Sequence, residues 1–295
     1  MTLAGRLLST PTTAVEVGPR RALTQMLEHP RFELLPLDGV VEVTVAHVPT
    51  HVKLTVTASP TRGIDATIDV ARRLVQHGYS VAPHLSARLV RDAGHLRELL
   101  DRLEAAGVRD LFVIAGDAPN PAGPYEGAAD LLAAMGEQRR RFAGIGISGY
   151  PESHHLISDD STIEAMFVKA AMATYIVSQI TFDAGVIAGW IDRVRARGTL
   201  LPIWIGVPGS VDQRRLLRVS MRIGLGESAR FLKTHRSWLR LALRRRFTPT
   251  ALLTDLAPTL ARPKARVAGL HVYTFNDVQA TERWRRELLE RLRDG

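Results

Sequence analysis

The sequence predicts an α/β protein folded as a single (β/α)8 TIM barrel with an N-terminal helical extension. Its 295 residues suit one barrel of about 250 residues as well as two smaller domains. Eight short apolar segments alternate with amphipathic, helix-like segments, and no change of composition marks a second domain. Apolar strands separated by helices indicate a parallel sheet covered by those helices, and eight such units in a chain of this length favour a closed barrel.

The strands are predicted from apolar or β-branched runs. Residues 52–58 alternate with a period of two, whereas residues 110–115 form the continuous apolar run that is typical of a fully buried strand. By the same reasoning, the eight strands are expected at residues 32–37, 52–58, 79–85, 110–115, 143–148, 175–181, 201–207 and 268–275.

The helices are predicted from apolar residues spaced three and four apart, with glycine as a stop. Residues 66–77 show this spacing at Ile68, Ala71 and Leu74 and are followed by Gly78. The first crossover, residues 38–51, is expected to be poorly helical because it contains Val41-Glu-Val-Thr-Val. The other helices are expected at residues 93–106, 127–140, 162–173, 184–197, 212–223 and 278–292, with a basic helical region that ends near residue 260.

Two parts of the chain are expected to differ in role. Residues 1–30 contain a polar, proline-bearing lead and a short helical stretch around residues 22–28, which we interpret as an N-terminal extension. Residues 31–295 contain all eight βα units and are expected to form the catalytic barrel.

Composition excludes several classes of protein. The chain contains no cysteine, which rules out disulfides, cysteine-ligated zinc, iron–sulfur clusters and thiol nucleophiles. Its longest apolar stretch, residues 163–190, is interrupted by charged residues and is too polar for a membrane span. The N-terminus lacks the pattern of a secretory signal. We therefore expect a cytoplasmic protein with no membrane partner.

The chain is basic, with 39 Lys and Arg against 30 Asp and Glu, a formal net charge of +9. Its densest runs are the arginines at 139–141 and 244–246. Such runs can bind nucleic acid, form a solvated helix face or attract a small polyanionic substrate. Composition alone does not choose among these.

A barrel places its chemistry at the C-terminal ends of the strands. Glu33 lies in an apolar strand at such a position, where a carboxylate is costly unless paired and burial favours the protonated form that a general acid needs. The alternative is a strand glutamate that points to solvent. Asp117 follows Gly116 at another strand end, where an aspartate can equally well form a turn.

Two motif matches are rejected. Gly144, Gly146 and Gly149 have the spacing of a dinucleotide fingerprint, but they lie within a strand, and Pro151 stands where a helix would have to begin. His154 and His155 are adjacent and lack a suitably spaced carboxylate, so no metal site is expected.

Six short motifs follow one another at the strand ends: Phe32-Glu-Leu-Leu-Pro36, Ala82-Pro-His-Leu85, Gly116-Asp-Ala-Pro119, Gly149-Tyr-Pro-Glu-Ser-His154, Ser178-Gln-Ile-Thr-Phe-Asp183 and Tyr273-Thr-Phe-Asn276. Each motif is weak alone, but six in the correct order are specific. Together they resemble the methylenetetrahydrofolate reductase family, whose fold is also a (β/α)8 barrel.

This resemblance implies an oxidoreductase of one-carbon metabolism and methionine biosynthesis that reduces 5,10-methylenetetrahydrofolate to 5-methyltetrahydrofolate. It gives Glu33 the role of the acid that supplies or relays a proton to N10. Asp117, Gln179 and Gln213 are then expected to bind the folate. The residues expected to bind the cofactor are Thr57, His84, Ser86, Gly116, His154 and Tyr273.

The chain departs from the family pattern where a flavin is usually held. Ala115 replaces an arginine placed for the flavin diphosphate, and Gly127 replaces a tyrosine, while Leu217 replaces a phenylalanine that usually lies near the folate and the nicotinamide. Because charge-assisted contacts to a diphosphate are strong, these losses favour direct hydride transfer from NADH, or from NADPH, without bound flavin. The alternative is an FAD-dependent enzyme in which Arg62 or Arg88 holds a phosphate from a new position.

Three further readings stay open: a folate-binding barrel protein without catalysis, a nucleic-acid-associated protein built on residues 230–247, and another barrel oxidoreductase acting on a different acceptor. Glu33 argues against the first, because tight binding alone does not need a buried acid. The polar strand ends would lack a purpose in the second, so no nucleic-acid partner is expected. The expected partners are tetrahydrofolate derivatives and, by resemblance to the family, further copies of the chain.

Overall fold

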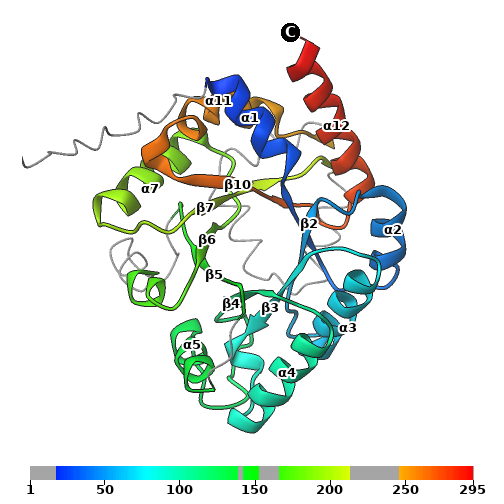
Figure 1. Cartoon of the computed structure of the whole chain (residues 1–295), viewed down its shortest axis with the longest axis vertical. Coiled ribbons are helices and arrows are strands. Elements are labelled where there is room, and N and C mark those ends of the chain that lie inside the picture. Colours follow the sequence, from blue (N-terminus) through cyan, green and yellow to red (C-terminus); the bar gives the residue numbers. More distant parts are fainter. Residues whose placement is uncertain (1–17, 139–141, 153–165, 213–245, 295) are drawn as a thin grey trace, which may run out of the picture.

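The computed structural model describes residues 18–138, 142–152, 166–212 and 246–294. In these residues, eight parallel strands close into a barrel in the order β1-β10-β7-β6-β5-β4-β3-β2 (Figure 1). All eight predicted strands are present, and the (β/α)8 fold is confirmed. The strands are β1 (Arg31–Leu34), β2 (Lys53–Val56), β3 (Val81–Ser86), β4 (Asp110–Ile114), β5 (Gly144–Gly149), β6 (Tyr175–Ser178), β7 (Ile203–Pro208) and β10 (Val267–Tyr273).

Helices form the outer layer around the barrel (Figure 1). They bury the outward side chains of the strands. Phe32, Leu54 and Leu111, for example, lie fully buried between barrel and helices. Residues 166–170 are also helical. The outer elements are α2 (Val40–His47), α3 (Gly63–Gln76), η1 (Ala87–Leu89), α4 (Ala93–Ala105), α5 (Ala128–Glu137), α7 (Ala184–Ala196), α11 (Thr250–Leu260), η2 (Pro263–Ala265) and α12 (Val278–Asp294).

Aspartates begin two of these helices. Asp92 accepts a hydrogen bond from the backbone N–H of His95 at 2.7 Å at the start of α4. Asp183 accepts bonds from the N–H groups of Gly185 at 2.8 Å and Val186 at 3.0 Å at the start of α7. Because such caps satisfy otherwise unpaired N–H groups, the aspartate that ends the fifth motif has a structural role.

The first crossover differs from expectation, because residues 40–47 form the helix α2. Gly39 begins it in a left-handed conformation (φ 76°), and Val40, Val41 and Thr44 bury one face. At the other end, the Tyr79 hydroxyl donates to the Val48 carbonyl at 2.5 Å. Burial and this cap outweigh the weak helix propensity of β-branched residues.

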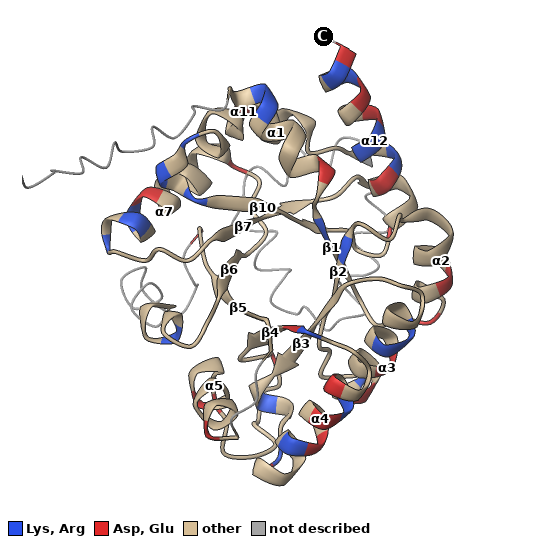
Figure 2. Cartoon of the chain, viewed as in Figure 1, with Lys and Arg blue, Asp and Glu red and all other residues tan. Residues whose placement is uncertain are grey.

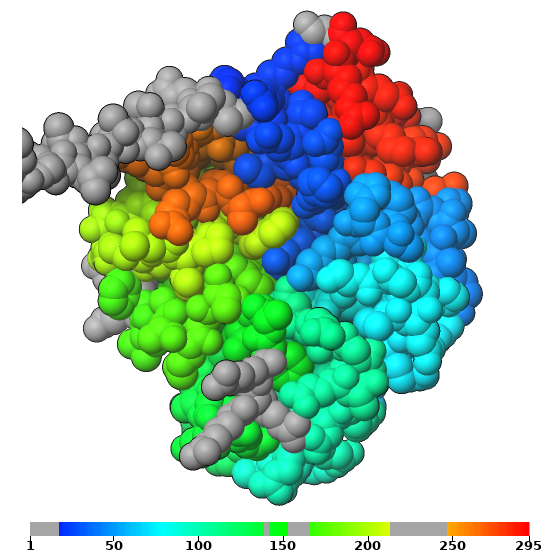
Figure 3. Space-filling model, viewed as in Figure 1, coloured from blue at the N-terminus to red at the C-terminus, as the bar shows by residue number. Residues whose placement is uncertain are grey.

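The helix α1 (Pro19–Glu28) lies within the predicted N-terminal extension and packs against α11 and α12. Figure 3 shows this N-terminal segment in blue between the orange and red C-terminal segments. A hydrogen bond from Arg285 of α12 to the Leu27 carbonyl at 2.8 Å joins α1 to α12, and two contacts of 2.7 Å with Glu282 of α12 hold the Arg285 guanidinium in place. The described part of the extension is therefore joined to the last helix of the barrel.

A polar layer fills the barrel at the N-terminal ends of its strands. The Arg31 guanidinium lies between two aromatic rings, 3.8 Å from the centroid of Trp204 and 4.1 Å from that of Tyr175. Asp110 accepts a hydrogen bond from the Tyr175 hydroxyl at 2.7 Å and forms an ion pair with Lys53. Burial raises the pKa of Tyr175, so its phenol stays protonated. This layer closes the barrel beneath the strand ends that carry the predicted site.

A small antiparallel sheet flanks residues 213–245. Its strands are β8 (Val211–Asp212) and β9 (Arg246–Phe247), with Asp212 paired to Arg246. The helix predicted at residues 212–223 and most of the predicted basic region lie outside the described residues. The helix α11 is the described end of that region.

Charged residues of both signs are interspersed on outer helices such as α3, α4 and α12 (Figure 2). In the described part of the chain, this pattern is typical of solvated helix faces. Of the two arginine runs, all but Arg246 lie outside the described residues. Among the described helices, none has both the length and the apolar character required to cross a bilayer.

Candidate active site

Glu33 is held in the barrel by its strand. The alternation of β1 sends Phe32 and Leu34 outward into the apolar core, so the Glu33 side chain points inward. Its neighbours in the sheet are Thr55 of β2 and Tyr273 of β10. The Glu33 side chain is 11% exposed, so its carboxyl group is almost entirely removed from water.

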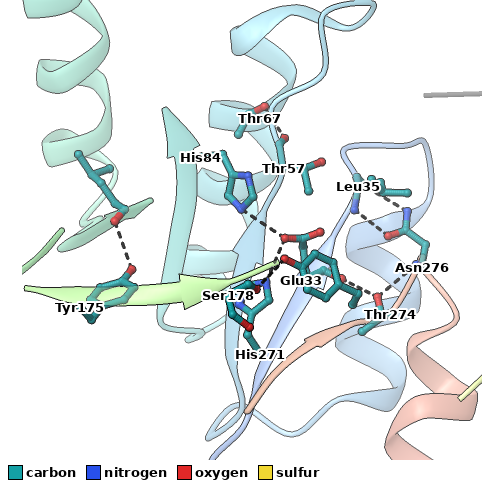
Figure 4. Close-up of polar contacts among 12 residues, drawn as sticks. Glu33, Leu35, Thr57, Thr67, His84, Tyr175, Ser178, His271, Thr274 and Asn276 are labelled. Atoms are coloured by element: carbon teal, nitrogen blue, oxygen red, sulfur yellow. Dashed lines mark hydrogen bonds and ion pairs between the residues drawn. The ribbon is translucent and has the colours of Figure 1, made fainter. Parts of the chain in front are cut away.

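Two histidines face the Glu33 carboxyl group (Figure 4). Its Oε2 lies 3.0 Å from Nε2 of His271 and 3.5 Å from Nε2 of His84. Burial lowers the pKa of His84 to about 4, although the nearby Glu33 carboxylate acts in the opposite direction. His84 is therefore neutral at pH 7, and its ring packs edge-on against Phe112 with centroids 4.6 Å apart.

Tyr273 lies near the Glu33 carboxyl group, and Tyr150 lies near Tyr273 and Asp117. Burial, and then the negative charge of Glu33, raise the pKa of Tyr273 well above its ordinary value. Burial and the Asp117 carboxylate raise the pKa of Tyr150. Both phenols thus keep their protons at neutral pH, and the Tyr273 hydroxyl donates to the Ser178 carbonyl of β6 at 3.2 Å. The tyrosines can donate hydrogen bonds but cannot act as bases there.

The loop after β4 presents Asp117, which is exposed. Gly116 precedes it with a φ of 89°, and an added Cβ would overlap the Ser86 hydroxyl. Only glycine suits both conditions. The Ser86 hydroxyl donates to the Ala115 carbonyl at 3.1 Å, so Ser86 and Gly116 shape this strand end together.

Arg88 holds the same loop from the side. Its Nε donates to the Ala118 carbonyl at 2.6 Å and its Nη2 to the Pro119 carbonyl at 2.7 Å. Arg62, the other predicted phosphate ligand, pairs with Asp38 at 2.8 Å. Both arginines considered for a rebuilt flavin site are therefore already engaged within the protein.

The structure brings most of the predicted site residues to the C-terminal mouth of the barrel. Figure 4 shows Glu33, Thr57 and His84 close together. Tyr273 and Ser86 end the strands β10 and β3, and Gly116 and Asp117 follow β4. Gln179 follows β6 and is exposed, and its N–H donates to the Gly149 carbonyl at 2.8 Å. Predicted residues His154 and Gln213 lie outside the described residues.

His271 is a site residue that was not predicted, although its place on the last strand is a signal for one. His271 and Tyr273 are two residues apart in β10 and therefore point to the same, inner face of the barrel. His271 is fully buried, and its Nδ1 has no hydrogen-bond partner among the described residues. Its Nε2 contact with Glu33 makes it part of the candidate site.

The glycine motif that was rejected as a dinucleotide fingerprint has a structural explanation, whereas His154 and His155 lie outside the described residues. A Cβ on Gly144, Gly146 or Gly149 would overlap Asp110, Tyr175 or Trp190, respectively, so these glycines make room for larger neighbours. Among the residues that the structure describes, no three His, Cys, Asp or Glu side chains are grouped as metal ligands.

Residues 37–227, nearly two thirds of the chain, match a family model described as methylenetetrahydrofolate reductase. The match includes Thr57, His84, Asp117 and Gln179, whereas Glu33 lies just before it.

Two curated relatives are similar over shorter stretches. Methylenetetrahydrofolate reductase 1 of Schizosaccharomyces pombe is 30% identical over 116 residues, which are 37% of this chain and 19% of that protein. Methylenetetrahydrofolate reductase 2 of Saccharomyces cerevisiae is 26% identical over 121 residues, 37% of this chain and 20% of that protein. The matched part thus spans about a fifth of each curated relative.

A solved structure shares the fold. The crystal structure of a candidate phosphonomutase from Burkholderia cenocepacia superposes with a TM-score of 0.51 and covers 92% of this chain and 98% of its own. The sequence identity is 11%, so this likeness concerns the barrel alone.

Proposed function

The chain belongs to the methylenetetrahydrofolate reductase family, and we propose on that premise that it reduces 5,10-methylenetetrahydrofolate to 5-methyltetrahydrofolate with NAD(P)H, without bound flavin. The position of Glu33 carries the assignment. A carboxyl group held between two buried histidines at the mouth of a barrel is suited to proton transfer and is not needed for packing.

The reaction needs one proton and one hydride. We assign Glu33 the proton, which goes to N10 of the folate as the bond between N10 and the methylene carbon breaks and an N5 iminium forms. The reduced nicotinamide supplies the hydride that converts this iminium to the N5-methyl group. Glu33 then regains its proton from solvent. NADH is preferred to NADPH in this proposal.

The surrounding residues would orient the two reactants. Asp117 and Gln179 are exposed at the mouth and are proposed to bind the pterin edge, together with Gln213. The carboxylate of Asp117 would also favour the cationic iminium electrostatically. Thr57, His84, Ser86, Gly116 and Tyr273, together with His154, are proposed to line the nicotinamide side. Thr57 Oγ1 is buried without a hydrogen-bond partner in the described residues, so it is available to a ligand.

The described residues fit a flavin diphosphate poorly. Ala115 and Gly127 carry no charge, and Gly127 instead begins α5, where its N–H donates to the Asp130 carboxylate at 2.9 Å. Arg62 and Arg88 are engaged with Asp38 and with loop carbonyls. Moving either arginine to a phosphate would break these bonds, which supports the flavin-free form of the proposal.

An absorbance spectrum of the purified protein, followed by an assay of NADH oxidation, tests the proposal. The expected protein is colourless and oxidises NADH only when methylenetetrahydrofolate is present, without any gain from added FAD. A yellow protein, or activity that appears only with FAD, would overturn the flavin-free mechanism. Folate binding without turnover under every condition would make the chain a binding protein instead.

The variant Glu33→Gln tests the acid. It removes the transferable proton while keeping the shape of the side chain, so turnover should fall by about 100-fold or more with folate binding retained. Glu98→Gln on the exposed surface of α4 is the matched control and should behave as wild type. Near-normal turnover in Glu33→Gln would remove Glu33 as the acid.

A further inference from the structure

After strand β10 has ended, the loop between β10 and α12 still forms hydrogen bonds to the segment that contains Glu33. The backbone pairing of β1 with β10 stops at Glu33 and Tyr273. The chain then turns away through Phe275 and Asn276, which both have positive φ angles, 49° and 59°. Two side chains of this turn reach back to the other chain segment: Thr274 to Glu33 of β1, and Asn276 to Leu35 just after β1 (Figure 4).

Thr274 binds the backbone of Glu33 itself. Its hydroxyl donates to the Glu33 carbonyl at 2.6 Å and accepts a hydrogen bond from the N–H of Asn276 at 3.1 Å. Thr274 is fully buried, so water does not compete for these bonds. The hydroxyl thus connects the turn to the residue that carries the proposed acid.

Asn276 binds the backbone two residues further along. Its Oδ1 accepts from the Leu35 N–H at 2.8 Å, and its Nδ2 donates to the Leu35 carbonyl at 3.0 Å. The amide therefore takes the place of a neighbouring strand and satisfies both backbone groups of Leu35. Asparagine is also among the residues that tolerate a positive φ, which the turn requires here.

We propose that Thr274 and Asn276 are positioning residues that set the place of the Glu33 carboxyl group. They fix the backbone at Glu33, the last β1 residue paired with β10, and at Leu35, which directly follows β1. This keeps the Glu33 side chain turned into the barrel with Oε2 3.0 Å from His271. The idea rests on the proposed function, because a displaced acid matters only if Glu33 transfers a proton.

Thr274→Val and Thr274→Ser form the matched pair that tests this. Valine keeps the shape of threonine and removes the hydroxyl, whereas serine keeps the hydroxyl. Because displacing a reacting group by about 1 Å can cost up to about 100-fold, we expect kcat of Thr274→Val to fall at least about tenfold with the folate KM nearly unchanged. Thr274→Ser should stay within about twofold of wild type.

Two further variants separate positioning from folding. Thr281 is also buried, and its hydroxyl donates to the Ser210 carbonyl of the segment after β7 at 3.4 Å. Thr281→Val should leave kcat unchanged. Asn276→Asp keeps the acceptor for the Leu35 N–H and loses the donor to the Leu35 carbonyl, so it gives a second test if Thr274→Val does not fold.

Histidine-selective ¹⁵N NMR provides a readout that needs no turnover. The His271 Nε2 signal reports its contact with Glu33, and Glu33→Gln identifies the shift that follows when this contact changes. The signal should move in Thr274→Val and Asn276→Asp but not in Thr281→Val. Folded Thr274→Val with unchanged kcat and unchanged His271 shifts would overturn the positioning role. A wild type that does not turn over folate would overturn the proposed function, while the NMR comparison would still decide the positioning.

Discussion

The buried His84 should make the folded protein sensitive to acid. Its pKa is about 4 in the folded state because burial disfavours the imidazolium, compared with 6.5 for an exposed histidine. Between these values the unfolded chain binds a proton that the folded protein does not. The free energy of unfolding must therefore decrease as the pH falls from about 6.5 towards about 4.

The size of this loss follows from the two pKa values. A difference of about 2.5 between them corresponds to about 3 kcal/mol once both states are fully protonated, at about 1.4 kcal/mol for each tenfold change. Between about pH 7.5 and about pH 4.5, the His84 contribution should be about 2 to 3 kcal/mol. This is a large fraction of the 5–15 kcal/mol that stabilises a typical protein.

Urea unfolding of wild type and His84→Gln at several pH values measures this contribution. Glutamine cannot take up a proton, so the difference in unfolding free energy between the two proteins should change by about 2 to 3 kcal/mol on acidification. His77→Gln is the control, because His77 is exposed at the end of α3. Parallel pH dependences for wild type and His84→Gln would refute the reasoning.

Three other substitutions have defined outcomes. Asp117→Asn should weaken folate binding and turnover together, as measured by titration and steady-state kinetics; an unchanged affinity would make Asp117 a turn residue. Arg88→Met removes the bonds to the loop that carries Asp117, so folate affinity should fall several-fold while NADH affinity changes less. If Arg88 only stabilised the fold, the two affinities would not change differently. Gly146→Ala places a methyl group against the Tyr175 ring and should lower the unfolding free energy by about 1–3 kcal/mol in urea titrations. Gly136→Ala is the control, because the added methyl group has open space in α5 and should not lower the unfolding free energy.

The strands and the mouth of the barrel could be predicted from the sequence because their signals are local. A parallel strand buried on both faces is a short apolar run, and the polar residues that follow it lie at one end of the barrel in every unit. Glu33, Thr57, His84 and Tyr273 were therefore placed correctly at the strand ends. Their roles in the reaction stay predictions.

The helix α2 could not be predicted because its cause is not local. Val41, Val43 and Val45 favour a strand by propensity. The segment is helical because Val40, Val41 and Thr44 become buried as α2 packs beside α3 and α12. The hydroxyl that donates to the Val48 carbonyl at the end of α2 belongs to Tyr79, which is 31 residues away in the chain. Tertiary contacts of this kind override propensity without leaving a local pattern.

The details of the site are equally non-local. The contact between Glu33 and His271 joins residues 238 positions apart, and Asn276 reaches Leu35 across 241 positions. Spacing along one sequence does not determine such pairs. The glycines of β5 were a usable clue, since glycine within a strand often marks a close neighbour, but the identity of Tyr175 and Asp110 as those neighbours required the fold.

The antiparallel pairing of β8 with β9 has a consequence for variation in length among related proteins. Asp212 and Arg246 are sheet partners, so the chain departs for residues 213–245 and returns at almost the same point. Insertions or deletions between such anchors change the closure entropy only slowly with length. The number of residues between Asp212 and Arg246 can therefore differ among related proteins while the barrel strands β7 and β10 on either side keep their register.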